Sequence, residues 1–226
     1  LLVKSGSKYF TKGKATLGVV MTNAHPCALD ILQETLRLGA DADAFAKADQ
    51  LRLLGAGLQD LPERMAAIAE NTHRIAQYMK QQMQQRGLTL TLYEMSPIQM
   101  AQGLASGILS FYLPPASPPP SIAESGIHDL VDAFVFFMLK NAPEQVKNRV
   151  SYGQSGGAIV NGVPQDYIYI INPEESTQGA LSQAVKDAQK KDNVQICRIS
   201  VPARCDVDAF TAVLGQFFTE TYGDCP

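Results

Sequence analysis

The chain has 226 residues, 46% of them hydrophobic and 18% charged, which is typical of a globular protein and enough for one large domain or parts of two. Its formal net charge of −3 provides no basic stripe and no apolar run reaches membrane-spanning length, so we expect neither a nucleic-acid nor a membrane partner. The cysteines and histidines are scattered without a CxxC pair, so the sequence predicts no metal site and no disulfide framework, and it favours a reduced, cytoplasmic setting.

The first predicted elements are two strands in residues 3–23, joined by a turn that carries Lys8. Lys8 follows the small residues 5–7 and precedes the apolar run at residues 17–21, so the pattern places it at the end of a strand, on a tight turn. A lysine held in this way can direct its amine into a cleft. Such an amine attacks an aldehyde when a desolvated site or a nearby cation keeps it neutral, which is the chemistry of a Schiff-base lysine. A solvated loop lysine is the alternative interpretation.

Two short hydroxyl side chains lie next to this lysine. Ser5 and Ser7 flank Gly6, which leaves backbone N–H groups accessible, and hydroxyl and N–H groups together can hold a phosphate beside the amine. Pyridoxal phosphate supplies both the aldehyde and the phosphate, and it also acts as an electron sink. Residues 5–8 therefore have the donor groups that a pyridoxal-phosphate site needs.

Three helices are predicted after the second strand, which ends near Thr22. Residues 25–38 form the first, with Gly39 as its stop, and residues 41–54 form the second. The third begins in the sequence GLQDLPERM and ends at Gly87, a typical C-cap residue. The apolar residues of the first two helices recur at helical spacing and are expected to face the core: Ala28, Ile31, Leu32, Leu36 and Leu38 in the first, and Ala44, Phe45, Ala48 and Leu51 in the second.

The remainder of the chain is predicted to mix strands and helices, with a proline-rich surface loop at residues 113–121. The prolines of this loop remove hydrogen-bond donors and fix φ, which excludes regular structure. The apolar patterns predict strands at residues 89–93, 107–113, 165–171 and 194–201, and helices at residues 127–139 and 207–217.

The turn around Lys8 resembles a known family. The sequences SGSKYF at residues 5–10 and TLGVVMT at residues 16–22 are similar to the S-A-T-K-Y-I and G-G-V-V signature around the cofactor lysine of the pyridoxal-phosphate-dependent Cys/Met metabolism family. This trans-sulfuration family includes cystathionine γ-synthase, cystathionine γ-lyase and methionine γ-lyase. The resemblance implies that Lys8 is the catalytic, cofactor-bound lysine and that Ser5 and Ser7 bind the cofactor phosphate.

Further motifs of the same family follow in the same order. The start of the third helix is similar to R-G-L-K-T-L-x-x-R-M, although Ala56 and Gln59 replace its leading arginine and its lysine. The later matches are G-x-L-S-F at residues 107–111, V-S-L-G at residues 150–153 and R-L-S-V at residues 198–201. After R-L-S-V the family continues G-L-E-D, whereas this chain has PARC at residues 202–205.

Two of these motifs imply substrate contacts. Ser151 matches a serine that lies beside the cofactor lysine and the substrate carboxylate, and a plain turn before Gly153 is the alternative. Arg198 matches an arginine that binds the substrate α-carboxylate. The residue type suits this task because the planar guanidinium makes two parallel hydrogen bonds to a carboxylate. An arginine inside an apolar strand needs a partner, since burial of a charge is costly, and a salt bridge is the alternative.

The resemblance implies an α/β fold, that of the fold type I pyridoxal-phosphate transferases. The family carries roughly its first half before the cofactor lysine, so this chain is expected to be the C-terminal half only. Residues 1–59 would then end a large cofactor-binding domain with a mostly parallel sheet. Residues 60–226 would form a small C-terminal domain of helices on a mixed sheet.

The implied function is an enzyme that acts on sulfur amino acids or homoserine esters, by β- or γ-elimination or by γ-replacement. Its partners would be a small-molecule amino-acid substrate and further copies of the chain in a homo-oligomer. The family's first half supplies the group that stacks on the cofactor ring and the acid that pairs with the ring nitrogen. The alternative is therefore a non-catalytic homologue or fragment that acts through subunit association.

Overall fold

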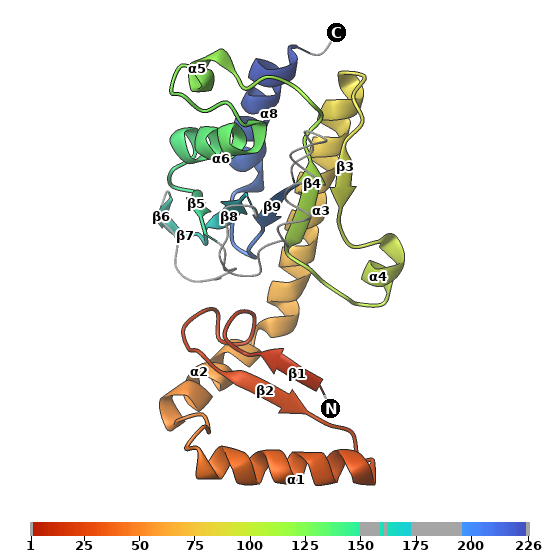
Figure 1. Cartoon of the computed structure of the whole chain (residues 1–226), viewed down its shortest axis with the longest axis vertical. Helices are drawn as coiled ribbons and strands as arrows, with labels where there is room; N and C mark the ends of the chain where they lie inside the picture. The colour runs from red at the N-terminus through yellow and green to blue at the C-terminus, as the bar shows by residue number, and fades with distance from the viewer. Residues whose placement is uncertain (1, 150–158, 161, 173–195, 225–226) are drawn as a thin grey trace. The chain divides into compact units, whose positions relative to one another are not determined.

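The structure, a computed structural model, describes residues 2–149, 159–160, 162–172 and 196–224 (Figure 1). These residues divide into two compact units, of which the first ends at Pro62 and the second begins at Glu63. The domain boundary expected at residue 59 stays a prediction, as does the assignment of the two parts to a large and a small domain. No helix in the described ranges is long and apolar enough to cross a membrane.

The first unit contains a two-stranded antiparallel sheet and two helices. Strand β1 (Leu2–Ser5) pairs with β2 (Gly18–Met21) over their full lengths, and the loop between them carries Lys8 (Figure 1). Helices α1 (Pro26–Asp41) and α2 (Ala48–Leu58) follow. The two predicted strands and the turn between them are therefore confirmed.

The boundary between the two helices was predicted wrongly. Helix α1 continues past Gly39 to Asp41, and α2 begins at Ala48 rather than at residue 41. Asp43 has a φ of 48°, a left-handed conformation that no α-helix continues through. The start of α2 is fixed instead by Gln50, whose side-chain oxygen accepts a hydrogen bond of 2.7 Å from the Lys47 N–H group.

The apolar residues of the first unit are exposed, contrary to the expectation that α1 and its neighbour face a core. No residue of α1 is buried, and within residues 2–62 no hydrophobic side chain falls in the buried class. A sheet of two strands offers too little apolar surface to cover a helix. The exposed large hydrophobic residues of this unit are Leu2, Val3, Val20, Met21, Leu29, Ile31, Leu36, Leu38, Phe45, Leu51 and Leu58.

The second unit is built on a five-stranded mixed sheet with the strand order β3-β4-β9-β8-β5 (Figure 1). Neighbouring strands are antiparallel except β8 and β5, which are parallel. Four of the strands lie within predicted ranges, and β5 was not predicted. The strands are β3 (Thr91–Tyr93), β4 (Ile108–Tyr112), β5 (Val146–Asn148), β8 (Ile168–Ile171) and β9 (Ile196–Ser200).

Three long helices bury their apolar faces against this sheet. They are α3 (Leu61–Gln85), α6 (Leu130–Asn141) and α8 (Val207–Tyr222), and the predicted helices at these places are confirmed. Helix α3 ends as predicted, since Gly87 has a φ of 67° and the Leu88 N–H group donates to the Met83 carbonyl at 2.9 Å. The centre of the core is a cluster of buried phenylalanines: Phe111, Phe134, Phe137, Phe217 and Phe218.

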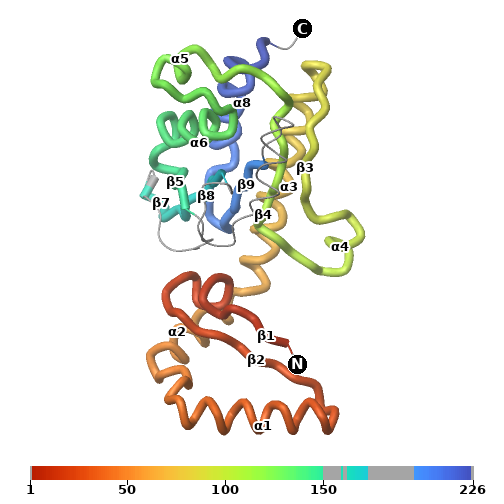
Figure 2. The backbone as a smooth tube through the Cα atoms, viewed as in Figure 1, coloured from red at the N-terminus to blue at the C-terminus, as the bar shows by residue number. Residues whose placement is uncertain are grey.

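The remaining elements are short. Helix α4 (Pro97–Ala101) lies between β3 and β4, and strands β6 (Ile159–Val160) and β7 (Val163–Pro164) form a small hairpin. The proline-rich loop is confirmed, although a one-turn helix, α5 (Pro120–Ala123), begins inside it (Figure 2). The loop is tied to α8, because the Tyr222 hydroxyl donates a hydrogen bond of 2.9 Å to the Pro114 carbonyl. Burial raises the pKa of Tyr222.

Candidate functional site

The lysine loop, residues 6–17, joins β1 to β2 and is closed by its own hydrogen bonds. The Gly6 N–H group donates to the Leu17 carbonyl at 2.9 Å, where the strands meet. Further along, the Thr11 N–H group donates to the Gly6 carbonyl at 3.0 Å, and the Gly13 N–H group donates to the Ser7 carbonyl at 2.8 Å. Because these bonds cross the loop on both sides of Lys8, they fix the backbone from which its side chain extends.

The hydroxyl of Thr11 ties the lysine loop together from within. Thr11 is only 1% exposed, and its hydroxyl lies 2.9 Å from the Ser7 carbonyl and 3.0 Å from the Ala15 carbonyl, between which its hydrogen is shared. Both carbonyls are partly buried and would each lose a donor without this hydroxyl, so the hydroxyl stabilises the loop. Thr11 was not predicted, because no motif distinguishes it from the polar residues around it.

We expect Thr11→Val, which keeps the shape of the side chain but removes the hydroxyl, to lower the free energy of opening of the lysine loop by about 1–3 kcal/mol. The measurement is the hydrogen exchange of the Gly6, Thr11 and Gly13 amides. Thr11→Ser retains the hydroxyl and serves as the control, with near-normal exchange. Equal exchange in Thr11→Val and the unaltered protein would show that the hydroxyl is dispensable.

The lysine loop also lies directly against α2. A Cβ atom built on Gly57 would lie 1.7 Å from the Phe10 carbonyl oxygen, so only glycine allows this approach of two backbones. The Lys12 amine forms an ion pair of 2.6 Å with Asp60, just beyond α2. Gly57 belongs to a sequence motif that also matched the family, and its close packing on Phe10 is a physical reason for a glycine there.

Gly57→Ala is expected to displace the lysine loop and to destabilise the first unit by about 1–3 kcal/mol, since the added methyl group overlaps a carbonyl oxygen that cannot rotate away. Gly55→Ala is the matched control. It lies on the same helix with nothing within 4 Å of the added Cβ, and alanine there should stabilise the helix by up to about 1 kcal/mol. Proteolysis within residues 6–17 reports on both variants, and similar rates in the two would contradict the expectation.

The structure brings Ser5, Ser7 and Lys8 together at the start of the lysine loop. Lys8 is half-buried and Ser5 is exposed. The Ser7 hydroxyl donates to the Leu17 carbonyl at 3.2 Å and accepts from the Leu17 N–H group at 2.9 Å, so its hydrogen is already engaged. Ser5 therefore fits a phosphate directly, whereas Ser7 would have to exchange its bond to Leu17 in order to donate to one.

Arg198 lies on β9, in the second unit, and its side chain lies on the face of the sheet opposite the phenylalanine core. Its neighbours on the strand, Cys197 and Ile199, are buried in that core, and side chains alternate along a strand. The strand register places Ser110 of β4 and Ile171 of β8 on either side of Arg198. The residue is half-buried, and its Nε atom is completely buried.

Lys8 and Arg198 belong to different units, so their predicted meeting in one cavity stays a prediction. Ser151, the third predicted substrate contact, lies outside the described residues. Ser5, Ser7 and Lys8 all lie in the first unit, and their role as a cofactor site stays a prediction. The structure presents the arginine separately, on the second face of a well-packed sheet.

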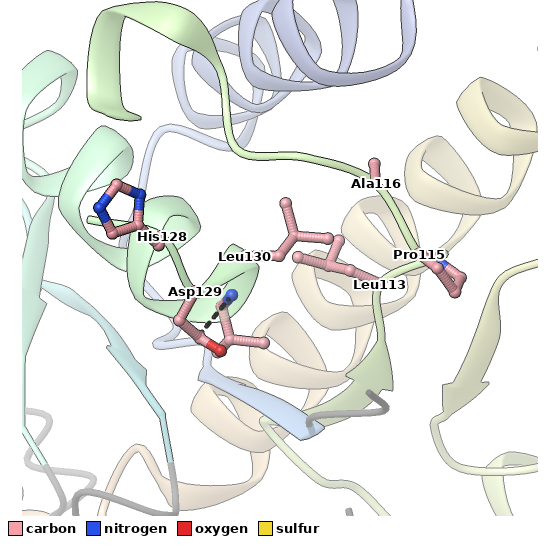
Figure 3. A pocket seen from close by; sticks show the side chains of 7 residues that line it. Leu113, Pro115, Ala116, His128, Asp129 and Leu130 are labelled. Atoms are coloured by element: carbon pink, nitrogen blue, oxygen red, sulfur yellow. Dashed lines mark hydrogen bonds between the residues drawn. The ribbon is translucent and has the colours of Figure 1, made fainter. Parts of the chain in front are cut away.

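A cavity of about 80 Å³ lies at the start of α6 but contains none of the predicted site residues (Figure 3). Its charged group is Asp129, whose carboxylate accepts hydrogen bonds from the N–H groups of Val131 at 3.0 Å and Asp132 at 2.9 Å. This is the usual arrangement of a helix N-cap. The remaining lining is mostly apolar, including Leu113 and Pro115, and Figure 3 shows the His128 ring turned away from them. The geometry indicates a capping role.

A second polar cluster in this unit is also explained by packing. The carboxylate of Glu94, whose side chain is 14% exposed, contacts the Lys80 amine and lies 3.3 Å from His73 Nδ1. His73 and Lys80 belong to α3, and Glu94 directly follows β3. The cluster therefore joins the helix to the edge of the sheet. In the described part of the chain, no group of acidic, histidine or cysteine residues has the arrangement of a metal site.

Comparison with known proteins identifies the fold. No protein-family model matches the sequence, and no curated protein matches it. The structure is similar to cystathionine γ-lyase from Lactobacillus plantarum complexed with L-serine, with a TM-score of 0.64 and 19% identity, over 98% of this chain and 51% of that chain. It is also similar to cystathionine γ-lyase from yeast, with a TM-score of 0.59 and 18% identity, over 96% of this chain and 49% of that chain.

A third similar structure is cystathionine γ-synthase from Xanthomonas oryzae pv. oryzae in complex with aminoacrylate and cysteine. Its TM-score is 0.59 at 15% identity, over 96% of this chain and 49% of that chain. This chain thus spans about half the length of these solved structures. The match corresponds to the C-terminal portion of their α/β fold, so the predicted fold class is confirmed.

Proposed function

We propose that the chain is part of a pyridoxal-phosphate-dependent trans-sulfuration enzyme, which eliminates or replaces a group at the β or γ carbon of a sulfur amino acid or a homoserine ester. The observation that carries the proposal is Lys8, held on a hydrogen-bonded loop between β1 and β2 in the fold of cystathionine γ-lyase and γ-synthase. The ordered series of sequence motifs supports it independently, because the motifs extend from the lysine loop to β9.

The lysine loop suits the cofactor in its donor groups. Lys8 supplies the amine that holds the cofactor, and Ser5 supplies an exposed hydroxyl for its phosphate, with Ser7 as a second contact if its bond to Leu17 is exchanged. When bound, pyridoxal phosphate supplies an aldehyde for an amine and a ring that draws electrons from the substrate Cα. Lys8 has a flexible side chain on a fixed backbone, which lets one amine serve both for attachment and for proton transfer.

Two residues of the chain act on the substrate. With the cofactor bound, the Lys8 amine would take the proton from the substrate Cα as a general base. The Arg198 guanidinium binds the α-carboxylate through two parallel hydrogen bonds and so fixes the orientation of the Cα–H bond. Ser151 would support Lys8 and the carboxylate.

The proposal extends to the setting of the enzyme. The substrate is a small-molecule amino acid and the protein assembles as a homo-oligomer, as the resemblance implies. The scattered cysteines favour a cytoplasmic location. Residues 1–59 would end the large cofactor-binding domain and residues 60–226 would form the small domain.

Trapping the cofactor on its lysine tests the proposal. Pyridoxal phosphate is added to the purified protein, the visible absorption band of lysine-bound cofactor is recorded, and borohydride reduction fixes the cofactor for peptide mapping. We expect a band and a modified Lys8, both lost in Lys8→Ala. Lys14→Ala, an exposed lysine of the same loop, is the control and should retain both. Modification at other lysines, or no band, would contradict the proposal.

The second candidate function, a non-catalytic protein that acts through subunit association, is favoured by the exposed apolar surface of the first unit. It predicts stable complexes without bound cofactor. The visible absorption of the purified complexes distinguishes the two candidates, because only the enzyme should show the band of lysine-bound cofactor.

A further inference from the structure

Lys12 adopts a backbone conformation that is uncommon for a lysine. Its φ is 56°, in the left-handed region, and in the described parts of the chain only Asp43 shares this feature among residues other than glycine. Aspartate tolerates the region because its short side chain can bond to nearby backbone groups, whereas a long side chain has no such local compensation. A residue held in this conformation costs free energy and persists only where its surroundings stabilise it, which is frequent at functional sites.

The left-handed turn at Lys12 determines the path of the lysine loop around Lys8. Lys12 and Gly13 have consecutive positive φ values of 56° and 74°, which turn the chain back toward the start of the loop. The Gly13 N–H group then reaches the Ser7 carbonyl at 2.8 Å. Because Ser7 directly precedes Lys8, the turn fixes the peptide group from which the Lys8 residue extends.

An ion pair stabilises Lys12 in this turn. Its amine lies 2.6 Å from the Asp60 carboxylate, and the Lys12 side chain is 26% exposed. The other left-handed residue, Asp43, also forms a 2.6 Å ion pair, with Lys47, but those two side chains are 86% and 59% exposed. Water screens the pair of Lys12 and Asp60 less, so this pair is the better able to offset the cost of the turn.

Contacts from both ends of α2 hold the part of the lysine loop that follows Lys8. Near the start of the helix, the Gln50 side-chain nitrogen donates a hydrogen bond of 2.8 Å to the Thr16 carbonyl. Just past the end of the helix, Asp60 binds Lys12. On the other side of Lys8 the loop continues directly from β1, which is paired with β2. A lysine on a loop that is fixed on both sides can direct its amine to one place.

We propose that Lys12 and Asp60 are positioning residues for Lys8. Their ion pair stabilises the left-handed turn, the turn fixes the backbone at Ser7, and the backbone directs the Lys8 amine toward the aldehyde of the cofactor. The inference rests on the proposed function. It goes beyond the family's motifs, because Lys12 lies outside the lysine signature and Asp60 replaces the threonine of R-G-L-K-T-L.

The rate at which Lys8 captures the cofactor tests the inference. After pyridoxal phosphate is added, we expect the band of lysine-bound cofactor to form about 10-fold more slowly in Lys12→Met and in Asp60→Asn than in the unaltered protein. Lys12→Arg keeps the ion pair and should recover most of the rate. Lys47→Met removes an ion pair of the same length in the same unit and should leave the rate unchanged. If the two pair-breaking variants speed only the hydrogen exchange of the Gly13 amide, the pair is structural and the inference is overturned.

A second readout needs no cofactor. Formaldehyde and cyanoborohydride methylate accessible amines, and peptide mass spectrometry gives the rate at each lysine. Lys8 is half-buried, so in Lys12→Met we expect its methylation to be about 2- to 5-fold faster, the range that loss of a partly exposed ion pair allows. Lys4, exposed on β1, is the internal reference. An unchanged ratio of Lys8 to Lys4 overturns the inference. Absence of the band from the unaltered protein would instead refute the proposed function, and the methylation ratio would still decide whether Lys12 positions the amine.

Discussion

Phe217→Ala should lower the free energy of unfolding of the second unit by about 3–5 kcal/mol, the largest effect on stability that we expect from a single substitution in this chain. Phe217 is 0% exposed, and its ring centroid lies 5.0 Å from that of Phe134, 5.4 Å from Phe137 and 6.0 Å from Phe218. These edge-to-face contacts add to the loss from apolar burial. The cavity would open where α6 and α8 meet, and close-packed neighbours cannot fill it.

The measurement is denaturant unfolding followed by circular dichroism, with hydrogen exchange of α6 amides as a local report. Phe136→Ala is the matched control, since Phe136 belongs to α6 but is 38% exposed. Its cost should be about 1 kcal/mol or less. Similar losses in the two variants would mean that the phenylalanine cluster is not the centre of the core.

On the proposed function, Arg198→Ala should lower kcat/KM for the amino-acid substrate by about 10²–10⁴-fold, because each of two hydrogen bonds to a charged group contributes about 1.5–3 kcal/mol. The change should fall mainly on KM, since carboxylate binding is common to the bound substrate and the transition state. Arg198→Lys should recover part of the loss, because it restores the charge but not the planar fork.

Arg74→Lys is the control for this variant. Arg74 is exposed on α3 and forms an ion pair of 2.6 Å with Asp208, also exposed. Its replacement should leave both kinetic constants within about twofold, as surface pairs contribute 1 kcal/mol or less. If Arg198→Ala changed only the melting temperature and not KM, the salt-bridge interpretation of Arg198 would replace the carboxylate one.

Periodicity in the sequence was sufficient to place most elements but not to say what covers them. Helix α3 and its C-cap at Gly87 followed from apolar spacing and a glycine stop, because both are local signals. The end of α1 was wrong because the left-handed residue that ends it, Asp43, is not marked by any pattern. The apolar residues of α1 were predicted to face a core and are exposed instead, because a periodic pattern shows that a helix has an apolar side but not what covers it.

The candidate site also contains residues that a local motif could predict and contacts that it could not. Ser5, Ser7 and Lys8 are contiguous, so one motif was enough to bring them together. Thr11 went unnoticed because its partners are carbonyl groups. The ion pair between Lys12 and Asp60 spans 48 positions, and no short sequence window contains both residues. Contacts of this kind are set by tertiary packing and not by local pattern.

Side chains alternate between the two faces of the sheet along β9, and this alternation restricts where the chain can accept an insertion or a deletion. Since Cys197 and Ile199 enter the phenylalanine core while Arg198 lies on the opposite face, a one-residue deletion within Ile196–Ser200 would exchange the two sets of side chains. A guanidinium would then be driven among aromatic rings, at a cost that no rearrangement of the core could offset. Evolutionary or engineered insertions and deletions should therefore be tolerated in the turn before α8 and excluded from the strand itself.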